Sequence, residues 1–357
     1  MTEREVTYPR IEKEFPEKWA FMVGVDAYPY IEKLKWCSRD VEELSKTFQN
    51  DLEFKPKNIF EFREGGEFPP DAGVIWHKIG DLRKSGQVER DHLLVFYFSG
   101  HGMIETTEEK DYLLPLTATE YNLRNSAMPL DDLVRELKGF ECDNVVLILD
   151  ACRSRANGTK GPESGFGQKM KLVSLSEGIV SFFSCQPKGK SFEIDKLKHG
   201  SFTYSLIEAI RAGNETVAEL DKFLQKQVQS VNDENGKGLQ LPWTKTEPTS
   251  LAGLAIFPNP GKRRAREAEV DKVEEGLMAL YLESKIGDLA YRGAMDVLGH
   301  VRSGAIAHEH RIVDLIKKLH SSPDTEEEFT RFLAVFENSQ SRRQPVYEIR
   351  KPPVSEQ

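Results

Sequence analysis

A cysteine and a histidine each follow a long apolar run in this sequence. The run Val145–Leu149 leads through Asp150 to Cys152, and the run Leu93–Phe98 leads to His101. Unbroken apolar runs of this kind are typical of strands that are covered on both faces in a parallel sheet. The carboxyl ends of such strands are where α/β sheets carry their functional sites. If the two strands are neighbours, the thiol and the imidazole come together although 51 positions separate them.

A Cys–His pair has the chemistry of acyl transfer. The imidazole takes the thiol proton, the thiolate attacks a carbonyl carbon, and the imidazole then protonates the leaving amine. Gly102 has no side chain, so its backbone N–H could reach an incoming carbonyl oxygen, with the N–H of Cys152 as the second donor of an oxyanion hole. Isolated cysteines and histidines are common structural residues in α/β folds, so the pair needs support from the rest of the chain.

Composition narrows the classes of protein to consider. The chain has 357 residues, 39% of them hydrophobic, and a formal net charge of −9; its mean hydropathy is −0.50. These values predict a soluble protein with one domain of about 200–250 residues and a smaller second part. The negative charge does not indicate a nucleic-acid partner. No apolar run approaches the ~20 residues of a membrane span.

The cysteines bear on location and on metal binding. The first residues are not followed by the apolar stretch of a signal peptide, so we expect a cytoplasmic protein with reduced thiols. The four cysteines show no paired metal-ligand spacing, and no glycine-rich phosphate loop follows a strand. We therefore expect neither a metal nor a cofactor. The cysteines are Cys37, Cys142, Cys152 and Cys185.

Hydrophobic patterning predicts an α/β fold with a mostly parallel sheet and helices on both faces, over residues 18–258. Strands are expected at Trp19–Val25, Asn58–Phe62, Leu93–His101, Asn144–Asp150, Ile179–Cys185 and Leu254–Phe257. Helices are expected at Arg39–Phe48, Asp71–Lys84, Leu130–Phe140, Gly200–Ile210 and Val217–Val231. Ser38 is predicted to be the N-cap of the first helix.

The rest of the chain divides by composition. Residues 1–17 form a polar N-terminal arm, and residues 259–266 form a basic linker. Apolar residues then recur at helical spacing over 267–338, which predicts a small all-α C-terminal region. Residues 339–357 are a polar tail.

Two motifs make this sequence similar to a known family. Ser-Gly-His101-Gly and Leu-Asp-Ala-Cys152-Arg, each closing an apolar strand and in this order, resemble the caspase-like peptidases. Within that superfamily they are most similar to paracaspases and metacaspases. The stretches Phe183–Gln186, Ser191–Ile194 and His199–Thr203 also resemble the paracaspase sequence after the nucleophile. The resemblance covers about residues 18–258 and does not extend to the C-terminal region.

The resemblance implies a caspase-like fold and a cysteine endopeptidase. His101 would be the general base and acid, and Cys152 the nucleophile. The residue before the cut bond (P1) is bound by acids in paracaspases and metacaspases, and the matching positions here are Asp40, Asp150 and Glu193. Carboxylates bind a guanidinium through charge-assisted, bidentate hydrogen bonds, so we expect cleavage after arginine, with lysine as a second choice.

Each of these acids could instead have an ordinary structural role. A single carboxylate is often solvated or caps a helix, and this applies most to Asp40. Asp150 differs because it ends a buried strand, where a charge requires a partner. Asp26, just after the first strand, is a weaker candidate for the same pocket.

Residues 153–170 are expected to be a long loop directly after the nucleophile, where many caspase-like zymogens are cut. Arg153, Arg155 and Lys160 are candidate processing sites for an enzyme that cuts after basic residues. The alternative is a surface loop whose basic residues only keep it soluble. Residues 105–111 are acidic but interrupted by Lys110, so they do not support calcium activation.

Two other functions remain open at this stage. One is a signalling scaffold that uses a peptidase fold only for binding; the intact pair of His101 and Cys152 argues against it. The other is a related thiol hydrolase with a different P1 preference, against which the three acids argue. Expected partners are protein substrates, together with an activating protease or a regulatory protein that docks on the C-terminal helical region.

Overall fold

A parallel sheet forms the centre of the molecule. The computed structural model describes residues 10–105, 110–155, 179–186 and 189–282, together with a few positions outside these ranges. Within them, β2 (Ile59–Phe62), β1 (Lys18–Gly24), β3 (Leu93–Glu105), β6 (Asn144–Arg155) and β7 (Ile179–Phe183) lie side by side in this order, and every neighbouring pair is parallel. The central strands are apolar along their length because both faces of the sheet are covered.

Antiparallel strands complete this sheet. On the β7 side the edge is β10 (Trp243–Glu247), which runs antiparallel to β7. The far end of β3 carries β4 (Lys110–Leu113), which in turn pairs with β5 (Met128–Pro129). The prediction of a closing strand at Leu254–Phe257 is wrong, because that apolar run is buried against the helical layer and forms only isolated bridges. The true edge strand reads Trp-Thr-Lys-Thr-Glu, and such polar alternation is usual where one side of a strand is unpaired.

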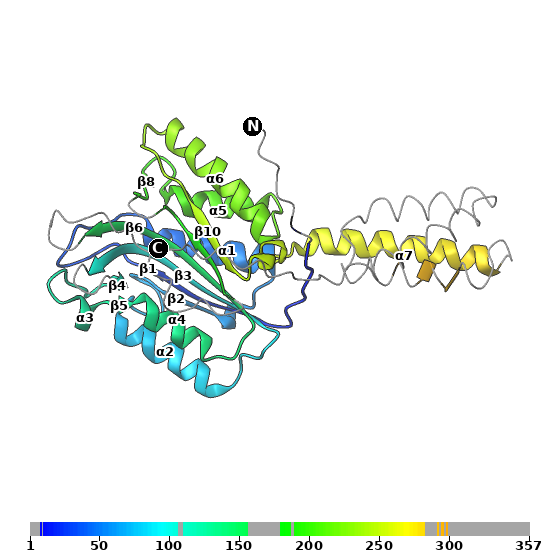
Figure 1. The fold of residues 1–357 in the computed structure, drawn as a ribbon, viewed down its shortest axis with the longest axis horizontal. Coiled ribbons are helices and arrows are strands. Elements are labelled where there is room, and N and C mark those ends of the chain that lie inside the picture. Colours follow the sequence, from blue (N-terminus) through cyan, green and yellow to red (C-terminus); the bar gives the residue numbers. More distant parts are fainter. Residues whose placement is uncertain are drawn as a thin grey trace, which may run out of the picture. The chain divides into compact units, whose positions relative to one another are not determined.

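Helices cover both faces, as Figure 1 shows. On one face α2 (Ala72–Ser85) and α4 (Leu130–Lys138) pack on the larger apolar core, near the short α3 (Leu123–Ser126). On the other face α1 (Cys37–Leu52), α5 (Ser201–Arg211) and α6 (Val217–Glu234) enclose the second core. The predicted α/β class with a mostly parallel sheet between helices is therefore confirmed.

The start of α1 differs from the prediction. Ser38 lies inside the first turn and is not the N-cap, which is Trp36 and has no side-chain cap bond of its own. The cap is supplied by Asp26, whose carboxylate accepts hydrogen bonds from the backbone N–H groups of Cys37 (2.7 Å) and Ser38 (2.9 Å). Asp26 comes from the loop after β1, so local sequence around the helix could not reveal this cap.

The chain divides into two compact units, residues 1–263 and residues 264–357. Helix α7 (Pro260–Leu282) begins where the sequence predicted a basic linker, so the described part of residues 259–266 is largely helical. In α7 the side chains of Val270, Val273 and Leu277 are buried. The predicted arm before Tyr8 and the region beyond Leu298 lie outside the described residues.

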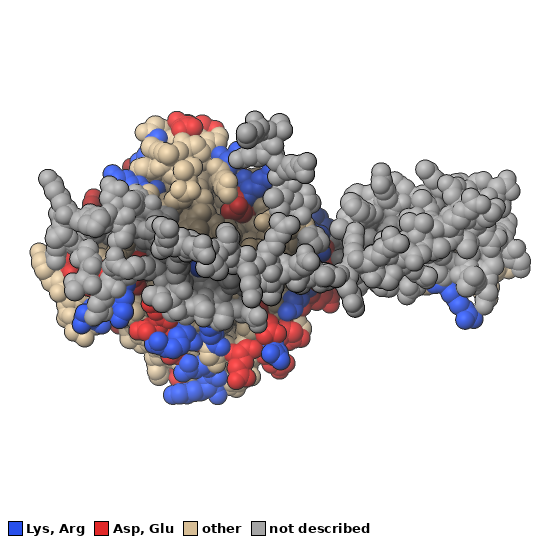
Figure 2. Space-filling view, viewed as in Figure 1, with Lys and Arg blue, Asp and Glu red and all other residues tan. Residues whose placement is uncertain are grey.

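The described surface carries both signs of charge. On the face drawn in Figure 2, acidic and basic side chains lie close to one another in small groups. None of the helices in the described ranges is both long and apolar enough to cross a membrane.

Candidate active site

The register of two central strands places the predicted pair side by side. Strands β3 and β6 are parallel neighbours whose pairing runs from Leu93↔Asn144 to Ile104↔Arg155. In this register His101 is the direct Cα partner of Cys152. Neighbouring strands lie about 4.8 Å apart, so the two backbones are adjacent at this position. The side chain of Cys152 lies outside the described residues.

The imidazole of His101 is held from two sides. Its Nε2 lies 2.7 Å from the backbone carbonyl oxygen of Glu32. The ring packs against that of Tyr28, with 4.8 Å between centroids, and the Tyr28 hydroxyl accepts from the His101 backbone N–H and donates to the carbonyl oxygen of Leu114. Because a carbonyl only accepts, Nε2 must carry the ring proton, which leaves Nδ1 as the basic nitrogen.

Nδ1 of His101 is in the state that a general base requires. It is buried and, within the described part of the chain, has no hydrogen-bond partner. Burial lowers the pKa of His101, so the ring is neutral near pH 7. No sequence pattern indicates Glu32 or Tyr28 as a partner of His101. Glu32 acts through a backbone carbonyl, which no residue type can signal.

The three predicted acids line one narrow pocket at the same end of the sheet. Asp40 comes from α1, Asp150 from the second half of β6, and Glu193 from β8 (Glu193–Ile194). The described residues that line it include no lysine or arginine; the others are Leu34, Cys37, Ser99, Gly100, Ser191, Phe192 and Gly200. Gly100 also connects the pocket to His101, the next residue of β3.

Asp150 is the most firmly held of the acids. Its Oδ1 accepts from the Ser191 hydroxyl at 2.7 Å, and its Oδ2 accepts from the Thr203 hydroxyl at 2.7 Å and the Thr203 backbone N–H at 3.2 Å. These bonds supply the partners that a buried carboxyl requires. Burial still raises the pKa of Asp150 above its ordinary value.

Asp40 is fully enclosed and bonded on both oxygens. Its Oδ1 lies 2.8 Å from Nδ1 of His199, its Oδ2 accepts from the Ser99 hydroxyl at 3.2 Å, and both oxygens are 3.2 Å from the backbone nitrogen of Gly200. Burial, and secondly the nearby Asp150, raise the pKa of Asp40 well above its ordinary value. The alternative of a solvated carboxylate is therefore wrong for this residue.

Glu193 forms the more open wall. One carboxylate oxygen, Oε1, accepts from the backbone N–H groups of Lys35 (2.9 Å) and Trp36 (2.8 Å), just before α1. Burial raises the pKa of Glu193 despite these bonds. The carboxylate thus links the β8 hairpin to the start of the helix that carries Asp40.

Gly200 is the point around which the acids are assembled. In the hairpin of β8 and β9 (His199–Gly200) it is the partner of Glu193. A Cβ at position 200 would lie 2.7 Å from Oδ2 of Asp150 and 3.0 Å from Oδ2 of Asp40. The close approach of both carboxyls therefore depends on the absence of a side chain here.

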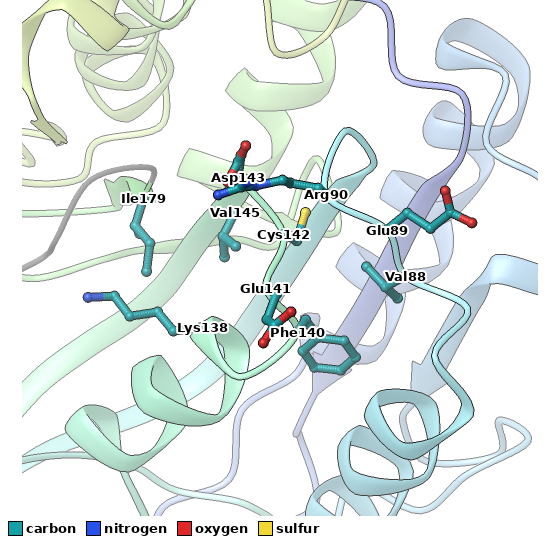
Figure 3. A pocket seen from close by; sticks show the side chains of 10 residues that line it. All are labelled: Val88, Glu89, Arg90, Lys138, Phe140, Glu141, Cys142, Asp143, Val145 and Ile179. Atoms are coloured by element: carbon teal, nitrogen blue, oxygen red, sulfur yellow. Dashed lines mark hydrogen bonds and ion pairs between the residues drawn. The ribbon is translucent and has the colours of Figure 1, made fainter.

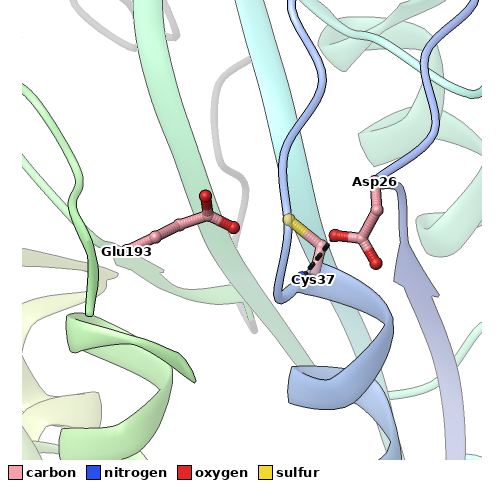
Figure 4. A group of neighbouring side chains, drawn as sticks. All are labelled: Asp26, Cys37 and Glu193. Carbon is pink, nitrogen blue, oxygen red and sulfur yellow. Dashed lines mark hydrogen bonds between the residues drawn. The ribbon is translucent and has the colours of Figure 1, made fainter. Parts of the chain in front are cut away.

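Among the described residues, two groups of side chains have the composition of metal ligands. Asp26, Cys37 and Glu193 lie close together beside the pocket (Figure 4). Both carboxylates of this group already accept hydrogen bonds from backbone N–H groups around the start of α1. Burial, followed by the charges of Asp26 and Asp40, raises the pKa of the Cys37 thiol well above its ordinary value, which disfavours the thiolate that a metal needs.

The second group consists of Glu89, Asp91 and His92, on the loop before β3. Nδ1 of His92 accepts from the Glu89 backbone N–H (3.0 Å) and lies 3.3 Å from Nε1 of Trp19. This imidazole is therefore a structural acceptor.

For the remaining predicted residues that the structure describes, the strand pairing gives the position of the backbone. Gly102 pairs with Arg153 on β6 and with Leu113 on β4. Arg155, the second candidate processing site, pairs with Ile104, so both arginines lie in β6 and not in a loop. Lys160 lies outside the described residues.

Comparison with known proteins bears on the fold and family. The profile of the Caspase domain matches residues 17–252. Among solved structures, a protein of Geobacter sulfurreducens is 14% identical over 68% of this chain and 100% of its own, with a TM-score of 0.48. Caspase-1 of Spodoptera frugiperda is 14% identical over 72% of this chain and 96% of its own, also with a TM-score of 0.48. The search of curated proteins found no match.

Proposed function

The chain belongs to the caspase domain family, and we propose that it is a cysteine endopeptidase that cuts protein substrates after arginine, with lysine as a second choice. One observation carries the proposal: His101 and Cys152 are paired across neighbouring strands, and the pocket beside them is lined by three acids. Asp40, Asp150 and Glu193 provide the negative charge that a guanidinium needs. They are also why we place the chain nearer to paracaspases and metacaspases than to caspases that cut after aspartate.

The catalytic cycle follows from the orientation of His101. Nε2–H donates to the Glu32 carbonyl, so the free Nδ1 takes the proton of the Cys152 thiol. The thiolate attacks the scissile carbonyl carbon, and the backbone N–H groups of Gly102 and Cys152 are the proposed donors to the resulting oxyanion. Because Gly102 is flanked by β4 and β6, its N–H must leave the sheet ladder to take this role. The imidazolium then protonates the leaving amine. A water molecule, deprotonated by the same ring, hydrolyses the thioester and restores the thiol.

Binding of the P1 side chain requires the pocket to widen. Its free volume is about 20 Å³, which is enough for about one water molecule. The wall that can yield is the partly exposed Glu193, since the side chains of Asp40 and Asp150 are buried. Opening at Glu193 would let the substrate guanidinium reach both buried carboxyls.

Processing after the nucleophile remains part of the proposal. Backbone held in a sheet is a poor protease substrate, so Arg153 and Arg155 must first leave β6 to be cut. This favours Lys160 as the site of activation. A role of residues 267–338 in docking a regulatory protein rests only on their helical spacing.

The deciding experiment is hydrolysis of matched fluorogenic peptides that end in Arg, Lys or Asp. We expect the Arg peptide to be cut fastest and Cys152→Ala to lower its kcat/KM by about 10³-fold or more. Cleavage after Asp would still support Cys152 as the nucleophile but would contradict the assignment of the acidic pocket to P1.

Inactivity on all three peptides calls for a second arm. The enzyme and Cys152→Ala are each nicked with trypsin, the trypsin is inhibited, and the assay is repeated. Activity that appears only in the nicked wild type identifies a latent zymogen. Continued inactivity contradicts the proposal and favours the signalling scaffold.

A further inference from the structure

His199 lies directly behind one wall of the acidic pocket without lining it. It is 8% exposed and forms β9 together with Gly200. Its Nδ1 is 2.8 Å from Oδ1 of Asp40, which is the shortest hydrogen bond between this carboxyl and the described residues. The other oxygen, Oδ2, is the one that approaches Asp150 across Gly200.

We propose that His199 is a positioning residue for substrate selection: it holds Oδ1 of Asp40 so that Oδ2 faces the P1 cation together with Asp150. The inference rests on the proposed function, because it concerns the side chain that this pocket binds. His199 acts only through Asp40 and does not touch the substrate.

The hydrogen bonds of Asp40 show why this contact matters. The Ser99 hydroxyl bonds Oδ2, and the backbone nitrogen of Gly200 is equidistant from both oxygens, so neither of them fixes Oδ1 alone. Without the imidazole the carboxyl could rotate about its Cβ–Cγ bond. It would also lose a donor that favours its charged form, which a guanidinium requires.

A neutral imidazole suits this position better than a cation would. A lysine or arginine beside Asp40 would neutralise the acid and compete with the substrate. Burial, and then the charge of Arg39, lower the pKa of His199; Arg211 acts in the same direction, and Glu43 opposes them. The ring, which lies near that of Tyr204, is therefore uncharged near pH 7. Because an ionised carboxylate only accepts, Nδ1 is the ring nitrogen that carries the proton and donates a hydrogen bond to Asp40.

Three substitutions at position 199 separate this role from general stability. The amide nitrogen of Asn occupies nearly the place of Nδ1 and can donate, whereas that of Gln reaches too far and Leu cannot donate. We expect H199L and H199Q to raise KM for the Arg peptide about ten-fold or more, with kcat within about two-fold. H199N should retain a KM close to that of the wild type.

A matched control removes another buried imidazole. His92 is 5% exposed and lies before β3, at the opposite end of the sheet. H92L should lower the unfolding temperature but leave KM for the Arg peptide unchanged. Unfolding midpoints of all variants are measured beside the kinetics.

The outcomes are distinct. If the wild type does not cut after Arg, the proposed function itself is contradicted, and the inference about His199 falls with it. If it does, an unchanged KM in folded H199L overturns the role of His199, as does an equal rise in H199N and H199Q. If H199L does not fold, the Asn and Gln variants decide in the same way: a rise in Gln alone supports the inference, and no rise in either overturns it.

Discussion

The two ends of the central sheet carry hollows of opposite character. At the carboxyl ends of β3 and β6 the acidic pocket is narrow and, among the described residues, has no basic lining. At the amino ends a much larger hollow of about 740 Å³ is lined by both signs (Figure 3). Its acids are Glu89, Glu141 and Asp143, and its bases are Arg90 and Lys138.

The two hollows differ in how their charges are balanced, and not only in size. In the large hollow Arg90 and Asp143 form an ion pair at 3.2 Å, so the protein itself supplies the counter-charge. In the small pocket burial raises the pKa values of Asp40 and Asp150, and the described residues that line it include no lysine or arginine. On the proposed function, the substrate supplies the cation that balances these acids.

The largest expected effect is a difference in activity between two single substitutions, one of an acid in each hollow. Asp150→Asn should lower kcat/KM for the Arg peptide about 100-fold, because a buried charge partner of the guanidinium is lost. Asp143→Asn should leave it within about two-fold, since an exposed ion pair contributes little. Equal losses in the two variants would show that the acidic pocket is not special.

Asp150→Asn, which should lower activity, should raise the stability of the folded protein. The raised pKa of Asp150 means that the folded state keeps this proton to higher pH than the unfolded state does. Its contribution to stability is therefore lost as pH rises above 3.8, the ordinary pKa of the group. We expect Asp150→Asn to raise the Tm of the substrate-free protein by about 2–4 °C at pH 8.

Scanning calorimetry at pH 5 and pH 8 checks this sign. The gain in Tm should be smaller at pH 5, where the wild-type carboxyl is closer to its protonated form. A lower Tm for the variant at pH 8 would mean that the hydrogen bonds from Ser191 and Thr203 outweigh the cost of the buried charge.

The smallest expected effect is on the reactivity of two cysteines. Cys37 lines the acidic pocket, and Cys142 lines the larger hollow. Burial raises the pKa of Cys142 to about 11, and that of Cys37 well above its ordinary value. Iodoacetamide at pH 7 should therefore label both at least about ten-fold more slowly than Cys152 in the native protein. Peptide mapping measures this, and rapid labelling of Cys37 would show that the acidic pocket opens without substrate.

Much of the framework could be predicted from local sequence. The apolar runs before His101 and Cys152 identify two buried strands, because strands covered on both faces need apolar residues throughout. Helix α2 begins one residue after its predicted start, with Asp71 as its cap. The residue types of the three acids and their match to a family pattern were enough to nominate a cationic P1 side chain.

Other features depend on contacts that local patterns do not encode. The polar edge strand β10 resembles a loop in sequence, and the cap of α1 comes from the loop after another strand. Strand β10 forms because it pairs with β7, and the start of α1 is capped because the loop after β1 packs against it. Sequence periodicity reports which face of an element is buried but not which partner buries it.

The candidate nucleophile, base and acids can be identified from residue types, since each has limited chemistry and lies near a recognisable strand or helix. Folding is needed to fix the register that pairs His101 with Cys152, the Glu32 carbonyl that orients the ring, and the bond from His199 to Asp40 across 159 positions. Side chains carry the chemistry, whereas their orientation and charge state depend on neighbours that folding brings together.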